Sequence, residues 1–413
     1  MIARTTFLAL LASLAFALVA SFAPRASAQD EADASVPTVD AAPPPTATVI
    51  PSASSPVPAA SDTSDAGVTA PEGAAAPPSE VASRGPGFSS AGGSRIRVGL
   101  EVFAQYSVRD VDAPSSNRTW FHQFDVPRVH AAVDGEYEGV RGRVVLEATR
   151  SASEGSLIGV AGDSLVLRIR EAYASYRPWG AFAIAAGVVP TLTVPELDGT
   201  WMMRAVAPSA VEAAGLLSPA DLGAKMRFDL PHRYGWIGAG AFNGDGYTSR
   251  ELNRGKNVES AVELHPLPDG PLLPVGVFAS YAVGSTGTTR ARADRLTAGL
   301  VWQGASIRAG ALLTYAWGRE QLGTAKGVVA SAFARVEPVS RLYLAARYDH
   351  VVRDAVNDPT DTVSRILASL GYRIADPLEA FLVFDRSIPS NRAQNELPGS
   401  NAWEGRVVAR VVF

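Results

Sequence analysis

The chain has 413 residues, no cysteine and a formal net charge of −4, and 47% of its residues are hydrophobic. Without cysteine it cannot carry a disulfide framework, a thiolate metal site or a lipid-modified cysteine. Its positive charges are scattered among apolar residues, which excludes the basic stripe of a nucleic-acid-binding protein.

The first 28 residues have the features of a secretory signal peptide. Arg4 supplies a positive charge, residues 7–22 are almost wholly apolar, and Ala26-Ser27-Ala28 is an A-x-A cleavage pattern. An uncleaved N-terminal anchor is the alternative, because the apolar stretch is long for a signal peptide. No later stretch reaches the roughly 18 uninterrupted apolar residues of a membrane helix. A membrane-spanning domain would therefore have to be a β-barrel.

Residues 29–94 differ from the rest of the chain in composition. They are rich in Pro, Ala, Ser and Thr, and they carry eight acidic side chains and one basic side chain, Arg84. A segment with so little to bury cannot offset its ordering entropy. The composition predicts a disordered, acidic periplasmic linker.

From Arg95 onward, apolar and polar residues alternate with a period of two, which is typical of strands with one apolar face. The first segment is the clearest, with apolar residues at every second position from Ile96 to Tyr106. The predicted strands span residues 95–108, 124–134, 141–150, 165–177, 181–189, 220–230, 234–243, 256–265, 275–284, 293–303, 305–318, 325–336, 340–351, 362–374, 378–387 and 402–413. We therefore expect an all-β domain over residues 95–413, a transmembrane antiparallel β-barrel of 16 strands.

The connections between these segments alternate in character. Seven are mostly tight turns, and the other eight are mostly longer and polar, such as 109–123, 190–219, 352–361 and 388–401. Short turns at one rim, long loops at the other and aromatic residues near the short turns are typical of Gram-negative outer-membrane barrels. A soluble all-β protein is the alternative, but the outward set is apolar along nearly every strand.

The last segment ends on an aromatic residue, Phe413, after alternating apolar or small residues from Trp403 onward. This ending resembles that of bacterial outer-membrane barrels, where it helps the barrel assembly machinery to recognise the chain. We therefore expect two partners, the assembly machinery and outer-membrane lipid.

Several stretches resemble the phosphate-selective porin O/P family of 16-stranded outer-membrane porins. Residues 167–178, followed by Gly187-Val188-Val189-Pro190, resemble the family's strand, turn and G-x-x-x-P motif, with the proline one residue early. Residues 241–246 and 256–258 resemble its F-N-G-x-G strand end and the strand that follows. The resemblance implies a homotrimer whose channels pass small anions or other small hydrophilic solutes by passive diffusion.

The inward faces of the predicted strands carry more basic than acidic side chains. With three strands of unclear parity left out, there are sixteen basic and ten acidic residues. A water-filled channel concentrates the effect of such an excess, which predicts a modest anion preference. Lumen basic residues named on this ground include Arg97, Arg143, Arg227, Arg365, Arg373 and Arg410.

The longest connection, residues 190–219, is expected to fold inward and narrow the channel. The candidate constriction residues are three on this loop and four on the wall: Glu196, Asp198 and Arg204, facing Arg128, Lys225, Arg347 and Arg406. The alternative interpretation is that these arginines are solvated or pair with neighbouring carboxylates and select nothing.

Other functions receive less support from the sequence. Gly162-Asp163-Ser164-Leu165 matches the GDSL string of a serine esterase family, but it lies in an expected surface loop, so no enzyme is predicted. No metal site is expected, because the five histidines lack metal-ligand spacing. No cofactor is expected either, because Gly238-Ala239-Gly240 is followed by Asn243 where a dinucleotide-binding loop needs its third glycine. A structural tether remains the alternative function, in which residues 30–93 bind the cell wall and the barrel acts as an anchor.

Overall fold

The computed structural model describes residues 87–89, 94–112, 118–150, 165–248, 255–268, 270, 272–286, 290–319, 322–397 and 400–413. All of them belong to one compact unit, Ala74–Phe413. The predicted signal peptide, most of the predicted linker and the first three residues of the GDSL string lie outside the described residues, so those predictions stay untested.

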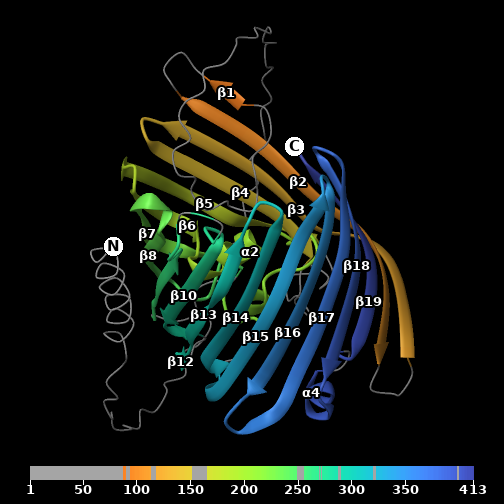
Figure 1. Ribbon diagram of the computed structural model, residues 1–413. Helices are drawn as coiled ribbons and strands as arrows, with labels where there is room; N and C mark the ends of the chain where they lie inside the picture. Colours follow the sequence, from red (N-terminus) through yellow and green to blue (C-terminus); the bar gives the residue numbers. More distant parts are fainter. Residues whose placement is uncertain are drawn as a thin grey trace, which may run out of the picture. The chain divides into compact units, whose positions relative to one another are not determined.

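Sixteen antiparallel strands close into a barrel (Figure 1). They are β2 (Arg95–Asp112), β3 (Arg118–Tyr137), β4 (Val140–Arg150), β5 (Leu165–Trp179), β6 (Phe182–Pro190), β7 (Ala220–Leu230), β8 (Gly235–Phe242), β9 (Asn257–Leu264), β10 (Val275–Val283), β13 (Asp294–Gln303), β14 (Ile307–Arg319), β15 (Leu322–Val339), β16 (Leu342–Asp354), β17 (Asp358–Ala375), β18 (Leu378–Pro389) and β19 (Ala402–Val412). Closure is made by β19 and β2, which pair from Ala402 opposite Val111 to Val412 opposite Glu101. The predicted 16-stranded antiparallel barrel is confirmed.

The alternating pattern of each strand separates an apolar outer face from a mixed inner face. Leu167, Leu300 and Leu382 point outward with exposed fractions of 70%, 58% and 59%. Large apolar side chains exposed on so many strands form the outer surface that lipid covers in transmembrane barrels. Trp179 and Tyr372 lie exposed beside short turns, where an aromatic girdle is expected.

Two of the predicted long loops are mostly strand. β16 reaches Asp354 and β17 begins at Asp358, so the predicted loop 352–361 is a tight turn, in which the Asp354 carboxylate accepts hydrogen bonds from the backbone N–H groups of Val356 and Asn357. The predicted loop 109–123 is likewise shortened, because β2 ends at Asp112 and β3 begins at Arg118. Strands that extend into water have no apolar face, and sequence alternation cannot separate them from loops.

A short strand, β1 (Gly87–Ser89), lies within the predicted linker. It pairs antiparallel with residues 95–97 of β2, beyond the place where Phe413 and Leu100 exchange backbone hydrogen bonds of 3.1 and 2.8 Å. The seam between the first and last barrel strands is therefore extended by the chain that precedes the barrel.

The remaining elements lie in the connections. They are α2 (Thr193–Trp201), α3 (Ala210–Ala213), the single 3-10 turn η1 (Pro231–Arg233), β11 (Ser285–Thr286), β12 (Ala291–Arg292) and α4 (Asn391–Glu396). Within the described parts of the chain, every helix is too short or too polar to cross a membrane.

Candidate functional site

The connection between β6 and β7, residues 191–219, folds into the barrel as the sequence predicted, and we call it the inner loop. Its apolar side chains, among them Leu197, Trp201 and Val211, form one buried cluster with inward-facing residues of every barrel strand from β8 to β19, the hairpin strands β11 and β12 excepted. Trp201 is 2% exposed, and its ring lies 5.4 Å from that of Phe333 on β15. The inner loop thus covers one long arc of the wall.

The loop begins at a carboxylate of the wall. Glu259 on β9 accepts hydrogen bonds from the backbone N–H groups of Leu192 (3.0 Å) and Thr193 (2.8 Å) at the start of α2. These N–H groups have no partner inside the helix, and a carboxylate there also meets the positive end of the helix dipole. Glu259 therefore fixes where α2 enters the lumen.

Four arginines of the wall donate hydrogen bonds to backbone carbonyls of the inner loop. The pairs are Arg295 with Leu216 (3.2 Å), Arg308 with Gly199 (3.0 Å), Arg347 with Pro208 (2.5 Å) and Arg406 with Val206 (2.9 Å). Together they attach the loop along its length, because each guanidinium satisfies a carbonyl that would otherwise be buried without a donor.

Arg347 and Arg406, which the sequence predicted to face the charged residues of the loop, therefore lie between the wall and the loop and bond to its backbone. The Arg347 side chain is 1% exposed, contacts Asp349 at 2.9 Å and lies 5.4 Å from the centre of the Trp201 ring. Arg406 also approaches Asp385 at 3.5 Å. Their bonds to loop carbonyls depend on the tertiary fold, which strand parity does not reveal.

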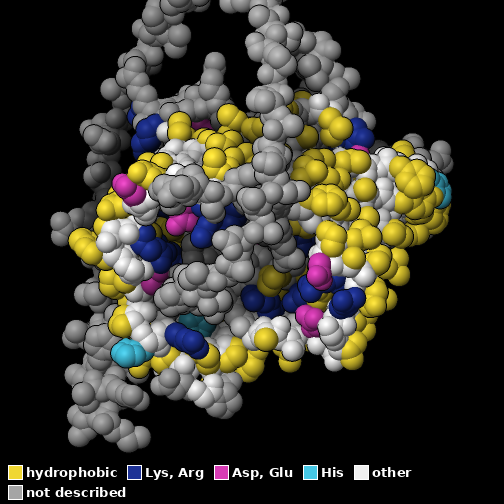
Figure 2. Space-filling view, turned by 90° about the horizontal axis from the view of Figure 1, so that it is seen from above, with side chains coloured by type: hydrophobic (Ala, Val, Ile, Leu, Met, Phe, Trp, Pro, Cys, Tyr) yellow, Lys and Arg dark blue, Asp and Glu magenta, His cyan; other side chains and the backbone are white. Residues whose placement is uncertain are grey.

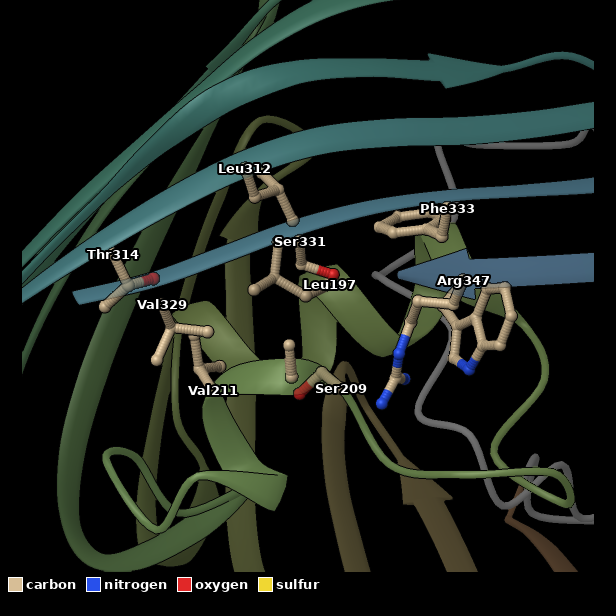
Figure 3. A pocket seen from close by; sticks show the side chains of 11 residues that line it. Leu197, Ser209, Val211, Leu312, Thr314, Val329, Ser331, Phe333 and Arg347 are labelled. Carbon is tan, nitrogen blue, oxygen red and sulfur yellow. The ribbon is translucent and has the colours of Figure 1, made fainter. Parts of the chain in front are cut away.

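Figure 3 shows this contact between loop and wall. Leu197 and Val211 of the loop face Leu312, Val329 and Phe333 of the wall. The void left between them is about 10 Å³, roughly the space of one water molecule. At this point little space remains between loop and wall.

The inner loop carries an acid–base cluster of its own. The Arg204 guanidinium lies between two carboxylates, bonded to Asp198 and, at 2.6 and 2.7 Å, to Glu212. Burial raises the pKa of Asp198 above its usual value even though Arg204 opposes the shift. Burial acts the same way on Glu212, but Arg204, with help from Arg170 and Arg128, lowers its pKa. The influence of Arg170 and Arg128 shows that this cluster faces β5 and β3.

On the wall, one carboxylate collects the basic groups that face the cluster. Glu147 on β4 contacts Arg128 at 3.3 Å and Arg170 at 3.2 Å. The hydroxyl of Tyr247, in the connection after β8, donates to the same carboxylate at 2.7 Å. Glu147 therefore holds Arg128 and Arg170 in fixed positions opposite the inner loop.

A buried histidine extends this network along the wall. The two ring nitrogens of His130 face Glu101 and Glu147, each at 3.1 Å, and the side chain is 1% exposed. Glu101 in turn accepts a hydrogen bond of 2.6 Å from Arg410. The charges of β2, β3, β4 and β19 are thus linked in one chain of contacts that orients Glu147.

Glu196 lies at the other end of the constriction, beside β7. Its carboxylate is 3.4 Å from Arg227, which also contacts Asp229 at 2.8 Å and stacks over Trp236 at 4.2 Å. Burial raises the pKa of Glu196 to about 7, and the nearby Glu263 adds to the shift while Arg227 opposes it. Glu196 is therefore a loop carboxylate that changes charge near neutral pH.

The wall residues named from the sequence differ in how far they are neutralised. Arg143 bonds Asp134 and Glu171, Arg365 bonds Asp385, and both Arg373 and Arg410 contact Glu379. Arg128 is 25% exposed, and Lys225 has no ion pair within the described residues. Arg97 lies at the rim, opposite Asp134 in the register.

Viewed from the end of the barrel where the C-terminus lies, basic and acidic side chains are interspersed inside a hydrophobic rim (Figure 2).

The sequence missed Arg170 because β5 is irregular. The register with β4 shifts between Val145 and Leu146, so the consecutive residues Arg170 and Glu171 both face the lumen and are buried. A β-bulge of this kind breaks the period of two on which face assignment depends.

No group of side chains suited to a metal ion occurs in the described residues.

No family model and no curated protein sequence matches the chain. Solved structures do. An anion-selective porin from Comamonas acidovorans has a TM-score of 0.58 and 12% identity over 78% of this chain and 100% of its own. OmpF of Salmonella typhi, in complex with daunomycin, has a TM-score of 0.58 and 13% identity over 79% of this chain and 100% of its own. The outer-membrane channel DcaP of Acinetobacter baumannii has a TM-score of 0.50 and 12% identity over 79% and 99%.

At these identities the likeness concerns the fold. It agrees with the closed antiparallel barrel described above. The protein therefore has the fold of the 16-stranded outer-membrane porins and belongs in the outer membrane of a Gram-negative bacterium.

Proposed function

We propose that the protein is a channel through which small hydrophilic solutes diffuse passively. The observation that carries the proposal is the one-sided packing of the inner loop. Its apolar face covers β8 to β19, and its charged face, with Arg204 and Glu212, lies toward Arg128 and Arg170. A constriction lined by opposed charges at the centre of a barrel suits a filter for small polar solutes. The names of two of the similar structures, a porin and a channel, agree with it.

We further propose a modest preference for anions, including phosphate-like ones. Lys225 has no ion pair within the described residues, and Arg128, 25% exposed, shares the single carboxylate of Glu147 with Arg170. The chain has only three lysines after residue 94, so arginines provide most of the positive charge. The preference should be modest because most other lumen arginines are paired with Asp or Glu. The name of the similar anion-selective porin supports this proposal, as does the resemblance to the phosphate-selective O/P family.

Assembly is a separate proposal. We propose that three copies associate, as that family resemblance implies, and that the assembly machinery reads the C-terminal Phe413. The Phe413 side chain is 55% exposed, and its backbone pairs with Leu100 at the seam. An exposed terminal aromatic residue is accessible to a binding partner before the seam closes.

A tether is the second candidate function, and β1 favours it. Its pairing with residues 95–97 places Gly87 at the rim of the short turns, which is the periplasmic rim of such barrels. The predicted linker that precedes Gly87 would then start from the periplasmic face. We assign no catalytic role to the protein.

Conductance separates the two functions. In planar bilayers the purified barrel should form stable single channels, with a reversal potential showing anion preference at low salt that weakens as salt rises, because ions screen the lumen charges. A chain lacking residues 29–86 should conduct equally well. A protein that inserts but passes no ions would leave only the tether.

Selectivity should also depend on pH through Glu196. Since its pKa is raised to about 7, the carboxyl is neutral below that pH and negative above it. The lumen therefore gains a negative charge as pH rises from 6 to 8, and the anion-to-cation permeability ratio should fall. Glu196→Gln should keep the low-pH ratio and flatten the step. If the variant showed the same change in permeability ratio between pH 6 and 8, a group other than Glu196 would cause the change.

A further inference from the structure

Basic side chains on the outer wall of the barrel are unfavourable where lipid tails cover them, and they cost least near the interfaces. Lys326 on β15 faces outward, since it lies opposite the outward-facing Trp317 of β14. Arg292 on β12 lies beside the same ring, with its guanidinium 5.4 Å from the ring centre. One guanidinium therefore lies over this indole on the outside of the barrel, and a lysine lies opposite it on the next strand.

Two tyrosine rings lie near this indole, one on the same strand and one on β10. The ring of Tyr315 lies 4.5 Å from that of Trp317, and the ring of Tyr281 on β10 lies 6.4 Å from it. All three residues are half-buried. Tyr and Trp prefer the level of lipid headgroups, because one end of each side chain is apolar and the other is polar. The cluster is thus built like an interface site.

The height of the cluster on the barrel also supports a position at the lipid interface. Trp317 lies ten residues after Ile307, which follows the short turn between β13 and β14. At about 3.3 Å per residue and a tilt of about 40°, ten residues rise roughly 25 Å, the height of the apolar band of such barrels. The cluster therefore lies at the extracellular interface, next to the headgroups of the outer leaflet.

Two acids, Asp294 and Asp354, lie beside the two cations and offset part of their charge. Asp294 is buried, with its carboxylate 3% exposed, and it accepts hydrogen bonds from the backbone N–H of Gly284 (3.1 Å) and from Arg292 Nε (2.6 Å). The Arg292 side chain is 44% exposed even so, and the Lys326 ammonium has no carboxylate partner within the described residues. Asp294 positions Arg292, and the Asp354 carboxylate accepts a hydrogen bond from the backbone N–H of Lys326. Neither contact covers the Arg292 guanidinium fully, so a ligand can still reach it.

We propose that this cluster binds a phosphorylated glycolipid of the outer leaflet. Its members are Arg292, Lys326 and the rings of Tyr281, Tyr315 and Trp317. The two cations pair with the phosphate, and the rings pack on the sugar and the start of the acyl chains. This inference requires only that the barrel lies in the outer membrane, so it stands or falls separately from ion conduction.

The test is native mass spectrometry of the full-length barrel in detergent, titrated with diphosphorylated lipid A and with its dephosphorylated form. The double variant Arg292→Gln, Lys326→Gln should bind the diphosphorylated lipid about tenfold or more weakly, since each cation near anionic headgroups contributes on the order of a fivefold change in affinity. Lys326→Arg, which keeps the charge, should bind like the wild type.

The matched control is Lys256→Gln, which removes a cation near the extracellular end of β9 that already donates to Asn243 Oδ1 at 3.0 Å. It should bind lipid like the wild type. Heat-shifted migration on a gel shows which variants are folded. Equal binding of the phosphorylated lipid by wild type and a folded double variant overturns the proposal. So does equally tight binding of the dephosphorylated lipid, which would leave only the apolar belt.

Discussion

Replacing Trp201 with alanine is expected to loosen the inner loop and raise single-channel conductance. The indole is 2% exposed, packs on Phe333, lies under the guanidinium of Arg347 and donates to the carbonyl of Ala207 at 3.0 Å. Removing such a side chain costs about 3–5 kcal/mol. The Thr193 N–H still donates to Glu259 at the start of α2, and Arg295 still donates to the Leu216 carbonyl near the end of the loop. The barrel should therefore fold while the middle of the loop moves.

Planar-bilayer recordings measure this directly. The variant should show larger and noisier unit conductance than the wild type, together with a lower unfolding temperature. Trp179→Ala is the control, because that indole is 70% exposed on the outer surface beside a short turn. Its loss should leave conductance unchanged. Unaltered conductance in folded Trp201→Ala would mean that the inner loop does not limit ion flow.

The second large effect is expected from the double variant Arg128→Gln, Lys225→Glu, which should reverse the ion preference toward cations. Glutamine is used at position 128 because a carboxylate there would lie against Glu147. One unit charge at about 8 Å contributes on the order of 0.5–2 kcal/mol for effective dielectric constants from 80 to 20. The anion-to-cation permeability ratio should therefore fall on the order of tenfold.

Reversal potentials in a potassium chloride gradient provide the measurement. The shift should shrink at 1 M salt, where the screening length is about 3 Å. Arg386→Glu is the control, since Arg386 lies opposite Trp403 on the outer face of β18 and does not enter the lumen. If that control shifted the ratio as much as the double variant, general surface charge and not the constriction would determine selectivity.

The anchoring of the inner loop explains why wall arginines cannot be interpreted from their strand positions alone. Arg347 and Arg406 face inward as the alternation predicts, and so does Arg128. Only the first two bond to loop carbonyls. Their replacement should disturb loop position first and selectivity second, unlike replacement of Lys225.

The barrel itself follows from the sequence, because strand periodicity is local and is repeated in every segment. Alternation from Ile96 to Tyr106 already separates a face for lipid from a face for water. The number of such segments and the contrast between turns and loops were enough to predict closure. Strand ends beyond the membrane, as at Asp354 and Asp358, escaped prediction since both faces there meet water.

The constriction was decided only by tertiary structure. Its contacts join residues far apart in the chain, such as Glu259 with Thr193 and Tyr247 with Glu147, and its inventory depends on the bulge that turns Arg170 inward. Local periodicity carries no information about which inward guanidinium meets a loop carbonyl and which meets solute. The packing of the loop on one arc of the wall determines which guanidinium groups bond to its carbonyls, because every polar group buried on that arc needs a hydrogen-bond partner.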